Sequence, residues 1–188
     1  MVGEKMELFL HMCCAPCSTY SIKHFRALGY QIHGYFYNPN IHPYKEFQRR
    51  LETLVAYCQQ EHVPLTVQRN YQLELFLQQT VNNLAERCRE CYTLRLFAAA
   101  NKAKSLGFTK FSTTLAISPY QDHQLLREIG EAAAQKHGVE FIYADLRPGY
   151  RESIKLSQAA GLYRQPYCGC IFSEKDRYYK GDQPEEIS

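Results

Sequence analysis

The sequence predicts an α/β fold in which helices flank a parallel sheet. Strand-like apolar runs alternate with longer stretches of helical periodicity, and glycine, proline and asparagine mark the boundaries between them. The chain has 188 residues, of which 45% are hydrophobic, so it can bury an ordinary globular core. We expect a single domain over residues 1–180 and a flexible polar tail over 181–188.

The first part of the chain predicts two strands, each followed by a helix. A buried strand over 6–12 precedes a helix over 16–28, which Gly29 closes as a C-terminal cap. A second strand over 31–37 ends at an Asn-Pro-Asn break, and Pro43 can open the next helix. The apolar side chains that share one face of this helix are Phe47, Leu51, Leu54, Val55 and Cys58.

Further strands and helices alternate along the rest of the chain. The remaining strands are expected over 65–68, 111–117 and 139–144. The remaining helices are expected over 73–106 with an interruption near Asn82, over an amphipathic stretch that contains Leu126 and Ile129 and stops near Gly138, and over 152–160. Because open α/β folds bind ligands at the carboxyl ends of their strands, the loops that follow the strands should form the site.

The charge balance does not fit a polybasic protein, and the apolar pattern does not fit a membrane protein. Lys and Arg number 22 against 19 Asp and Glu, and the net charge of +3 still permits a local basic face. No stretch approaches the run of about 18 apolar residues that a membrane-spanning helix needs. Glu4 and Glu7 lie where a signal peptide would be basic, so we expect a cytoplasmic protein with no membrane partner.

Cysteines carry the strongest chemical signal in the sequence. Seven of the eight fall in three tight groups, which are Cys13, Cys14 and Cys17; Cys88 and Cys91; and Cys168 and Cys170. In a chain without an export signal, clustered thiols indicate metal or redox chemistry rather than disulfides. Cys58 stands alone on the apolar face of its helix, and we expect it to be an inert core residue.

The first cysteine group lies where the first strand should end and a helix begin. Unpaired N–H groups at the start of a helix lower thiol pKa values and favour thiolates, which are both nucleophiles and metal ligands. Cys14 and Cys17 alone have the C-x-x-C spacing of a thioredoxin-like redox pair, whereas Cys13 is a third thiol that such a pair does not need. A thiol–disulfide oxidoreductase that uses Cys14 and Cys17 is therefore one alternative.

The other two groups bring the number of thiols to seven. Cys88 and Cys91 would share a helix face, and Gly169 lets the backbone turn between Cys168 and Cys170. An iron–sulfur cube or a structural zinc ion takes four thiolates, which leaves three for a second metal or a reactive pair. The wide separation of the groups is unlike a zinc ribbon, and a zinc-stabilised nucleic-acid-binding module is the second alternative.

Several ordered motifs over about residues 6–173 are shared with one enzyme family. They are His11-Met12-Cys13-Cys14-Ala15-Pro16-Cys17-Ser18; Tyr37-Asn38-Pro39-Asn40-Ile41-His42-Pro43; Cys88-x-x-Cys91-x-x-x-Arg95; Thr113-Thr114-Leu115; Ser118-Pro119-Tyr120; and Tyr163-Arg164-Gln165 through Tyr167-Cys168-Gly169-Cys170. With these motifs the chain resembles the cobalamin-independent epoxyqueuosine reductases, the QueH family. Leu146 stands where the family pattern has Phe, and Ala15 stands where Gly is usual.

The resemblance implies the last step of queuosine biosynthesis, in which epoxyqueuosine at the tRNA wobble position loses its epoxide oxygen by a two-electron, two-proton reduction. It implies a 4Fe-4S cluster, a second, mononuclear iron, tRNA as partner and an external low-potential electron donor. The family fold resembles the Rossmann-like adenine-nucleotide hydrolase (HUP) group, with the metal site at the carboxyl edge of the sheet. This chain has neither a Ser-Gly-Gly loop nor a Walker A motif, so we expect no use of ATP.

Candidate residues follow from these motifs and from the predicted sheet edge. All seven grouped cysteines are expected to bind metal, and the preferred cluster ligands are Cys88, Cys91, one of Cys168 or Cys170, and one thiol of the first group. The candidate proton donors are Asp145 and Tyr150, although Asp145 could instead bind the second iron or pair with Arg147. The expected substrate-binding residues are Tyr37, Asn38, His42 and Arg164. His11, on a buried strand, is expected to be a hydrogen-bonded core residue.

Basic side chains could contact the backbone of the tRNA. They are Lys45, Arg49 and Arg50 on the polar side of the helix after Pro43; Arg87, Arg89 and Arg95 beside the second cysteine pair; and Arg147, Arg151, Arg164, Lys175, Arg177 and Lys180 in the last quarter of the chain. Most basic side chains on a protein are solvated surface, so we expect only some of these to touch RNA.

Overall fold

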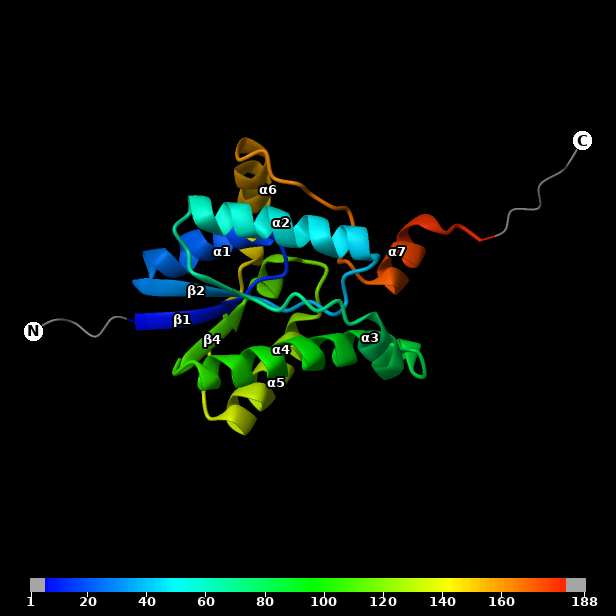
Figure 1. Ribbon diagram of the computed structural model, residues 1–188, viewed down its shortest axis with the longest axis horizontal. Coiled ribbons are helices and arrows are strands. Elements are labelled where there is room, and N and C mark those ends of the chain that lie inside the picture. Colours follow the sequence, from blue (N-terminus) through cyan, green and yellow to red (C-terminus); the bar gives the residue numbers. More distant parts are fainter. Residues whose placement is uncertain (1–5, 182–188) are drawn as a thin grey trace, which may run out of the picture.

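The structure, a computed structural model, describes residues 6–181 and contains a five-stranded parallel sheet between layers of helices (Figure 1). The strands are β1 (Met6–His11), β2 (Tyr30–Phe36), β3 (Leu65–Val67), β4 (Lys110–Thr113) and β5 (Glu140–Phe141). They lie in the order β3-β2-β1-β4-β5, and every neighbouring pair is parallel. The expected α/β fold class is therefore confirmed. The strand order reverses between β1 and β4, which is where folds of this kind bind ligands.

Helices connect the strands and cover both faces of the sheet. They are α1 (Ala15–Ala27), α2 (Tyr44–Gln60), α3 (Leu73–Thr80), α4 (Arg87–Ser105), α5 (His123–His137), α6 (Tyr150–Ala159) and α7 (Ile171–Tyr178), with short 3-10 turns η1 (Leu84–Glu86), η2 (Thr114–Ile117) and η3 (Arg147–Gly149). In Figure 1, α1, α2 and α6 lie above the sheet, and α3, α4 and α5 lie below it. The strand β1 starts at the left of that view, and α7 lies at the right.

The hydrophobic core lies on both faces of the sheet, because helices cover both. Leu8, Phe9 and Leu10 of the central strand are fully buried, because a strand with helices on both sides is apolar at every position. The apolar face of α2 is also buried as the periodicity predicts, except for the half-buried Val55. Cys58 on that face is 2% exposed, and burial raises its pKa to about 12. The thiol is therefore neutral and inaccessible, as expected of an inert core residue.

The last two strands are shorter than the apolar runs that predict them. The Thr113 side chain accepts a hydrogen bond from the backbone N–H of Leu115 (3.2 Å), and this capping interaction ends β4 and starts η2. β5 has two residues, because it lies at the edge of the sheet and pairs with β4 alone. The helix α7 follows the last cysteine and was not expected from the sequence. Beyond Gly181, the expected polar tail over 181–188 lies outside the described residues.

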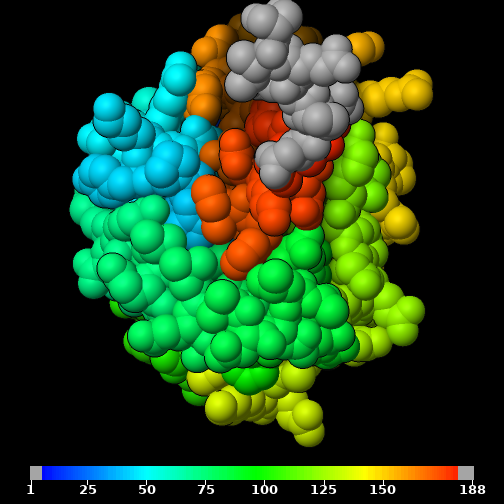
Figure 2. Space-filling view, turned by 90° about the vertical axis from the view of Figure 1, so that its right-hand side faces the viewer, coloured from blue at the N-terminus to red at the C-terminus, as the bar shows by residue number. Residues whose placement is uncertain are grey.

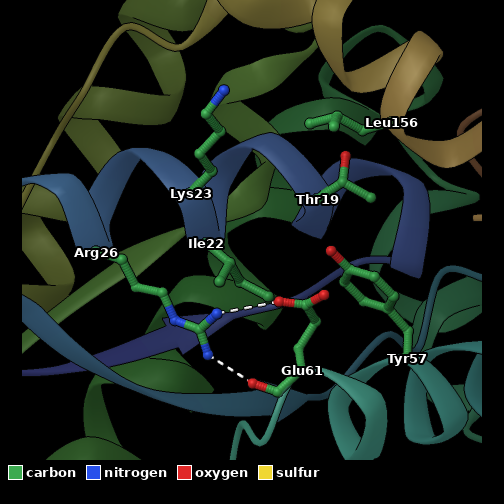
Figure 3. A pocket seen from close by; sticks show the side chains of 7 residues that line it. All are labelled: Thr19, Ile22, Lys23, Arg26, Tyr57, Glu61 and Leu156. Carbon is green, nitrogen blue, oxygen red and sulfur yellow. Dashed lines mark hydrogen bonds and ion pairs between the residues drawn. The ribbon is translucent and has the colours of Figure 1, made fainter. Parts of the chain in front are cut away.

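A shallow groove lies where α1, α2 and α6 meet, toward the end of α1 that is distant from the cysteine loop (Figure 3). Arg26 crosses it, donating one hydrogen bond to the Glu61 carboxylate (3.0 Å) and another to the Glu61 backbone carbonyl (2.6 Å). Both side chains are partly exposed, so this is a surface ion pair. Within residues 6–181, no helix combines the length and the hydropathy needed to cross a membrane.

Candidate metal centre

The loop after β1 brings three thiols together. The sulfur atoms of Cys13, Cys14 and Cys17 all lie within 4.8 Å of one another. Cys14 is the N-cap residue of α1, so the first turn of that helix carries Cys17 back toward the end of the strand. The Thr114 hydroxyl, at the start of η2 directly after β4, fixes Cys13: it accepts from the Cys13 backbone N–H (3.1 Å) and donates to the Cys13 sulfur (3.4 Å). This three-thiol set lies at the point where the strand order reverses.

The three thiols have unequal affinities for protons. Hydrogen bonds from Cys14 and Cys17, helped by the nearby charge of Arg95, lower the pKa of Cys13 well below its usual range. Because Cys14 and Cys17 donate these hydrogen bonds, they hold their protons more tightly: the pKa of Cys14 is raised to about 12, and the pKa of Cys17 is also raised. In the metal-free protein one thiolate is therefore favoured at Cys13, with two neighbouring thiols as its donors.

The second and third cysteine groups lie next to each other. Cys91 and Cys170 are buried in one apolar cluster with Phe76 of α3. Cys88 and Cys168 are exposed, and the charge of Cys168 acts on both Cys88 and Cys91. A hydrogen bond from Cys170 lowers the pKa of Cys168 to about 5, and the same bond raises the pKa of Cys170. These four thiols form a second set, contributed by α4 and by the loop before α7.

One buried guanidinium connects the two sets. Arg95 lies one helical turn after Cys91 and is 3% exposed. Its Nη1 contacts the Cys91 sulfur (3.7 Å), and its Nη2 donates to Asn38 Oδ1 (2.7 Å) in the loop after β2. The positive charge of Arg95 acts on Cys13 and Cys168 as well as on Cys91. All three cysteine groups therefore lie around this one side chain.

A second buried arginine holds the last cysteine group in place. Arg50 of α2 is 2% exposed, and its Nη1 and Nη2 donate to the backbone carbonyls of Cys168 (3.0 Å) and Tyr167 (3.2 Å). Its Nε donates to the Glu46 carboxylate (2.6 Å), which also accepts from the Tyr163 hydroxyl (2.6 Å). The expectation that Arg50 lies on the polar face of its helix and reaches for tRNA is therefore wrong, because the segment before α7 covers it. Figure 2 shows this segment and α7, in orange to red, between α2 in cyan and α3 and α4 in green.

The backbone around Gly169 fits the loop that follows β2. The Gly169 carbonyl accepts a hydrogen bond from the His42 backbone N–H (2.8 Å), and the Tyr167 hydroxyl donates to the His42 carbonyl (2.7 Å). Gly169 has a φ of +111°, and a Cβ at this position would lie 2.9 Å from both Arg50 Nη1 and Ile41 Cγ1. The turn between Cys168 and Cys170 therefore needs glycine, both for its backbone conformation and for its close packing.

Buried polar atoms without partners gather in the segments around the thiols. Within the described residues, those that accept or donate no hydrogen bond are Asn40 Nδ2 and Oδ1, His42 Nδ1 and Nε2, Gln72 Oε1, Arg95 Nε and Gln165 Oε1. Native proteins rarely leave such atoms unpaired, and where they occur an ion or ligand often supplies the partner. Thiolates are also the ligands that iron–sulfur clusters and zinc prefer. The residues present therefore fit a thiolate-bound metal group.

The other candidate residues have diverse surroundings. His11 is a hydrogen-bonded core residue, as expected: Nδ1 bonds to Thr113 Oγ1 (2.8 Å), Nε2 bonds to the Tyr37 carbonyl (3.2 Å), and burial lowers its pKa to about 3. Asn38 is buried and donates to the Met12 carbonyl (3.0 Å) while it accepts from Arg95. His42 is buried against Phe76 (5.0 Å between ring centres), and burial lowers its pKa to about 4. Arg164 is exposed.

The two candidate proton donors differ in protonation. Asp145 is held by Arg147, with Oδ1 accepting from the backbone N–H (3.1 Å) and from Nε (2.8 Å), and Oδ2 accepting from Nη2 (2.6 Å). These hydrogen bonds lower the pKa of Asp145 to about 2, so the carboxyl group is ionised at neutral pH. Tyr150 begins α6, and burial, together with the nearby Tyr120 and Cys17, raises its pKa. Tyr150 therefore keeps its phenolic proton, whereas Asp145 forms the ion pair that was its alternative role.

Comparison with known proteins identifies the family. A family model described as epoxyqueuosine reductase QueH matches residues 8–176. The chain belongs to the QueH family. An epoxyqueuosine reductase QueH from Dehalococcoides mccartyi is 40% identical over 178 residues, covering 95% of this chain and 98% of the relative. QueH proteins from Thermotoga maritima (33% identity, 92% and 93% covered) and Helicobacter pylori (38% identity, 89% and 49% covered) are also similar.

Solved structures share the fold, and one of them shows the extent of the likeness. It is that of a predicted subunit of a tRNA methyltransferase from Methanocaldococcus jannaschii, with a TM-score of 0.52 at 12% identity, covering 81% of this chain and 74% of the other. At this identity the likeness is one of fold alone. Membership of the QueH family is thus established by sequence. In this chain the fold is a parallel sheet with a cysteine loop after its central strand.

Sequence reasoning missed some residues that build this QueH site. Glu46 holds the last cysteine loop through Arg50, and neither residue has a distinctive spacing that would reveal this role. Thr114 lies in the Thr113-Thr114-Leu115 motif, but its contact with Cys13 was not expected. A glutamate four residues before an arginine is typical of a solvated helix face, so the pattern predicts a surface ion pair. Asn40 lies within the Tyr37–Pro43 motif that carries part of the family resemblance, and that motif is the signal that could have drawn attention to it.

Proposed function

We propose that this chain reduces epoxyqueuosine in tRNA to queuosine, the last step of queuosine biosynthesis, at the centre formed by its three cysteine groups. In the balanced reaction, two electrons and two protons enter, both C–O bonds of the epoxide break, water leaves and a carbon–carbon double bond forms. An external low-potential donor supplies the electrons. Membership of a family of epoxyqueuosine reductases supports the reaction. The observation that carries it is the gathering of seven thiols from three remote segments around Arg95.

The grouping of the thiols suggests which metal each set holds. Four thiolates suit a 4Fe-4S cluster, and we assign to it the set Cys88, Cys91, Cys168 and Cys170. We assign the second, mononuclear iron to the remaining set, Cys13, Cys14 and Cys17, whose sulfur atoms lie within 4.8 Å of one another. This differs from the sequence-based preference for a cluster ligand from the first group. When bound, the two groups would supply single-electron transfer and a Lewis acid.

Polar side chains next to the thiols are suited to hold the substrate. Asn40 offers a donor and an acceptor that no described residue engages, so a polar ligand would satisfy them, and His42 of the same loop remains a proposed substrate contact. Asn38 supports the site by fixing Arg95. Tyr37 and the exposed Arg164 remain proposed substrate contacts, with Arg164 free to meet a phosphate group. The wobble nucleotide lies in a loop, which keeps the cost of turning its base into a site low.

Tyr150 is the better candidate for proton donation. Its phenol keeps its proton at neutral pH, and the residue interacts with Cys17 and Arg164. Asp145 is ionised in its pair with Arg147, so it holds no proton to donate. We therefore assign one proton of the reaction to Tyr150 and the other to water. Tyr150 would act as a general acid, because its phenol would give a proton to the substrate and regain one from solvent after each turnover.

The decisive experiment is anaerobic reconstitution with iron and sulfide, followed by reaction of epoxyqueuosine tRNA with a strong chemical reductant and mass analysis of the nucleosides. The expected result is a brown protein with about five irons per chain that forms queuosine. Cys58→Ser is the matched control and should retain both properties, because Cys58 is isolated in the core. A colourless zinc protein, or a fully loaded protein without turnover, would contradict the proposal.

A double variant with serine at Cys88 and Cys91 separates the proposed reductase from the two alternative functions. A thiol–disulfide oxidoreductase would keep its activity after serine replaces Cys88 and Cys91, because its chemistry needs only Cys14 and Cys17. The proposed reductase should lose its cluster and its activity in that double variant. A nucleic-acid-binding module stabilised by zinc would bind tRNA without any turnover. Iron content and product formation, measured on the same samples, therefore distinguish all three.

A further inference from the structure

Arg95 is a buried cation without a carboxylate partner. It is 3% exposed, and no ion pair of the described residues includes it. Its hydrogen-bonding contacts go to an amide oxygen and to a sulfur atom, namely Asn38 Oδ1 and Cys91 Sγ. A buried charge without an opposite charge is costly, and the burial of this guanidinium needs a compensating negative group. The groups on which its charge acts are the sulfur atoms of Cys91, Cys13 and Cys168.

The position of this charge is fixed. The fork of the guanidinium reaches Cys91 with one nitrogen and Asn38 with the other, and Asn38 is itself anchored by its bond to the Met12 carbonyl (3.0 Å). The neighbouring His11 is neutral, because burial and the Arg95 charge both depress its pKa. Arg50 is a second buried cation beside the thiols, but Glu46 neutralises it, whereas Arg95 contacts a ligand sulfur directly. A point-like ammonium could not make both contacts of Arg95 equally well.

We propose that Arg95 is a positioning residue that supplies the fixed positive charge of the metal centre and thereby sets its reduction potential. This inference rests on the proposed function, since it requires a cluster on the thiols. Reduction adds one negative charge to a cluster, so a cation held against a ligand sulfur favours the reduced state and raises the potential. Hydrogen bonds to the sulfur atoms act in the same direction.

The test compares midpoint potentials of reconstituted protein by spectroscopically monitored redox titration without tRNA. Arg95→Gln should lower the equilibrium constant for reduction by about tenfold, a shift of about 59 mV to more negative potential for one electron. Arg95→Lys keeps the charge and should stay closer to the wild type. Arg89→Gln removes a charge from the exposed side of the same helix, next to Cys88, and should leave the potential unchanged because solvent screens it.

Each outcome decides the matter. A fully loaded Arg95→Gln protein with the wild-type potential would overturn the proposal, as would an equal shift in Arg89→Gln. If Arg95→Gln fails to hold iron, full loading of Arg95→Lys supports the role of the charge. Failure of both variants to load overturns it, because lysine retains the charge. If the wild-type protein itself takes up no cluster, the proposed function fails rather than this inference.

Discussion

The hydrogen bonds and the ion pair made by the buried Arg50 should contribute several times more to the free energy of unfolding than a surface ion pair does. The substitution Arg50→Met tests this. Methionine has a similar volume but removes the two bonds to the Cys168 and Tyr167 carbonyls and leaves Glu46, whose side chain is 10% exposed, without its cation. Breaking one partner of a buried pair costs about 3–5 kcal/mol. We expect a loss of that size in the free energy of unfolding.

The matched control is Arg26→Met in the groove of Figure 3. Arg26 also pairs with a glutamate, Glu61, but the two side chains are 42% and 31% exposed. Surface pairs of this kind contribute about 0.2–1 kcal/mol, because water screens the charges. The comparison thus holds the chemistry of the pair nearly constant and changes its burial.

Urea denaturation of the metal-free protein, followed by circular dichroism, measures both losses. Alkylation of Cys170, which is 6% exposed, provides a second readout, because an undocked segment should expose this thiol without unfolding the sheet. Arg50→Met should therefore either unfold at lower urea or react faster at Cys170. Equal urea midpoints for the two variants, together with wild-type alkylation at Cys170, would refute the reasoning.

Three further predictions concern the loop glycine, the proton donors and the core thiol. Gly169→Ala should cost about 1–3 kcal/mol and reduce the iron content, because the residue has a φ of +111° and no room for a Cβ; a variant with full iron and unchanged stability would contradict this. Tyr150→Phe should lower turnover by about 100-fold or more at unchanged iron content, whereas Asp145→Asn should retain most of its turnover; the reverse order in steady-state assays would assign the proton to Asp145. Burial raises the pKa of Cys58 from 9.0 to about 12, so above pH 9 the unfolded state loses this proton first and the stability falls as the pH rises. Between pH 9 and 10 the wild type should lose about 1 kcal/mol more than Cys58→Ser in urea titrations, and parallel losses would show that the thiol does not titrate in this way.

Local sequence patterns predicted the elements well where a single residue decides a boundary. Gly138, for example, ends α5 in the left-handed conformation that favours glycine. They failed where the apolar run continued past the end of a strand. The Thr113 hydroxyl competes with the sheet for the Leu115 backbone N–H, and β5 lacks a second neighbour to lengthen it. The end of β4 and the shortness of β5 therefore depend on a side-chain hydrogen bond and on strand pairing, and the apolar periodicity of the sequence reveals neither.

The candidate site shows the same division. The seven grouped cysteines and the Cys91-x-x-x-Arg95 spacing are visible in the sequence, because metal-binding chemistry requires particular atoms at short intervals. The burial of Arg50 and Arg95 is not visible, because an arginine on a helix is solvated unless another segment covers it. The segment before α7 provides that cover for Arg50.

The sequence by itself determined the order of strands and helices, the family and the set of thiols, all of which depend on residue type and short spacing. Only the tertiary structure decided how the thiols divide into three and four, and which cations lie among them. The physical reason is that these properties depend on distances between segments far apart in the chain. Those distances are set by the packing of the sheet, its helices and the last loop, which no local pattern specifies.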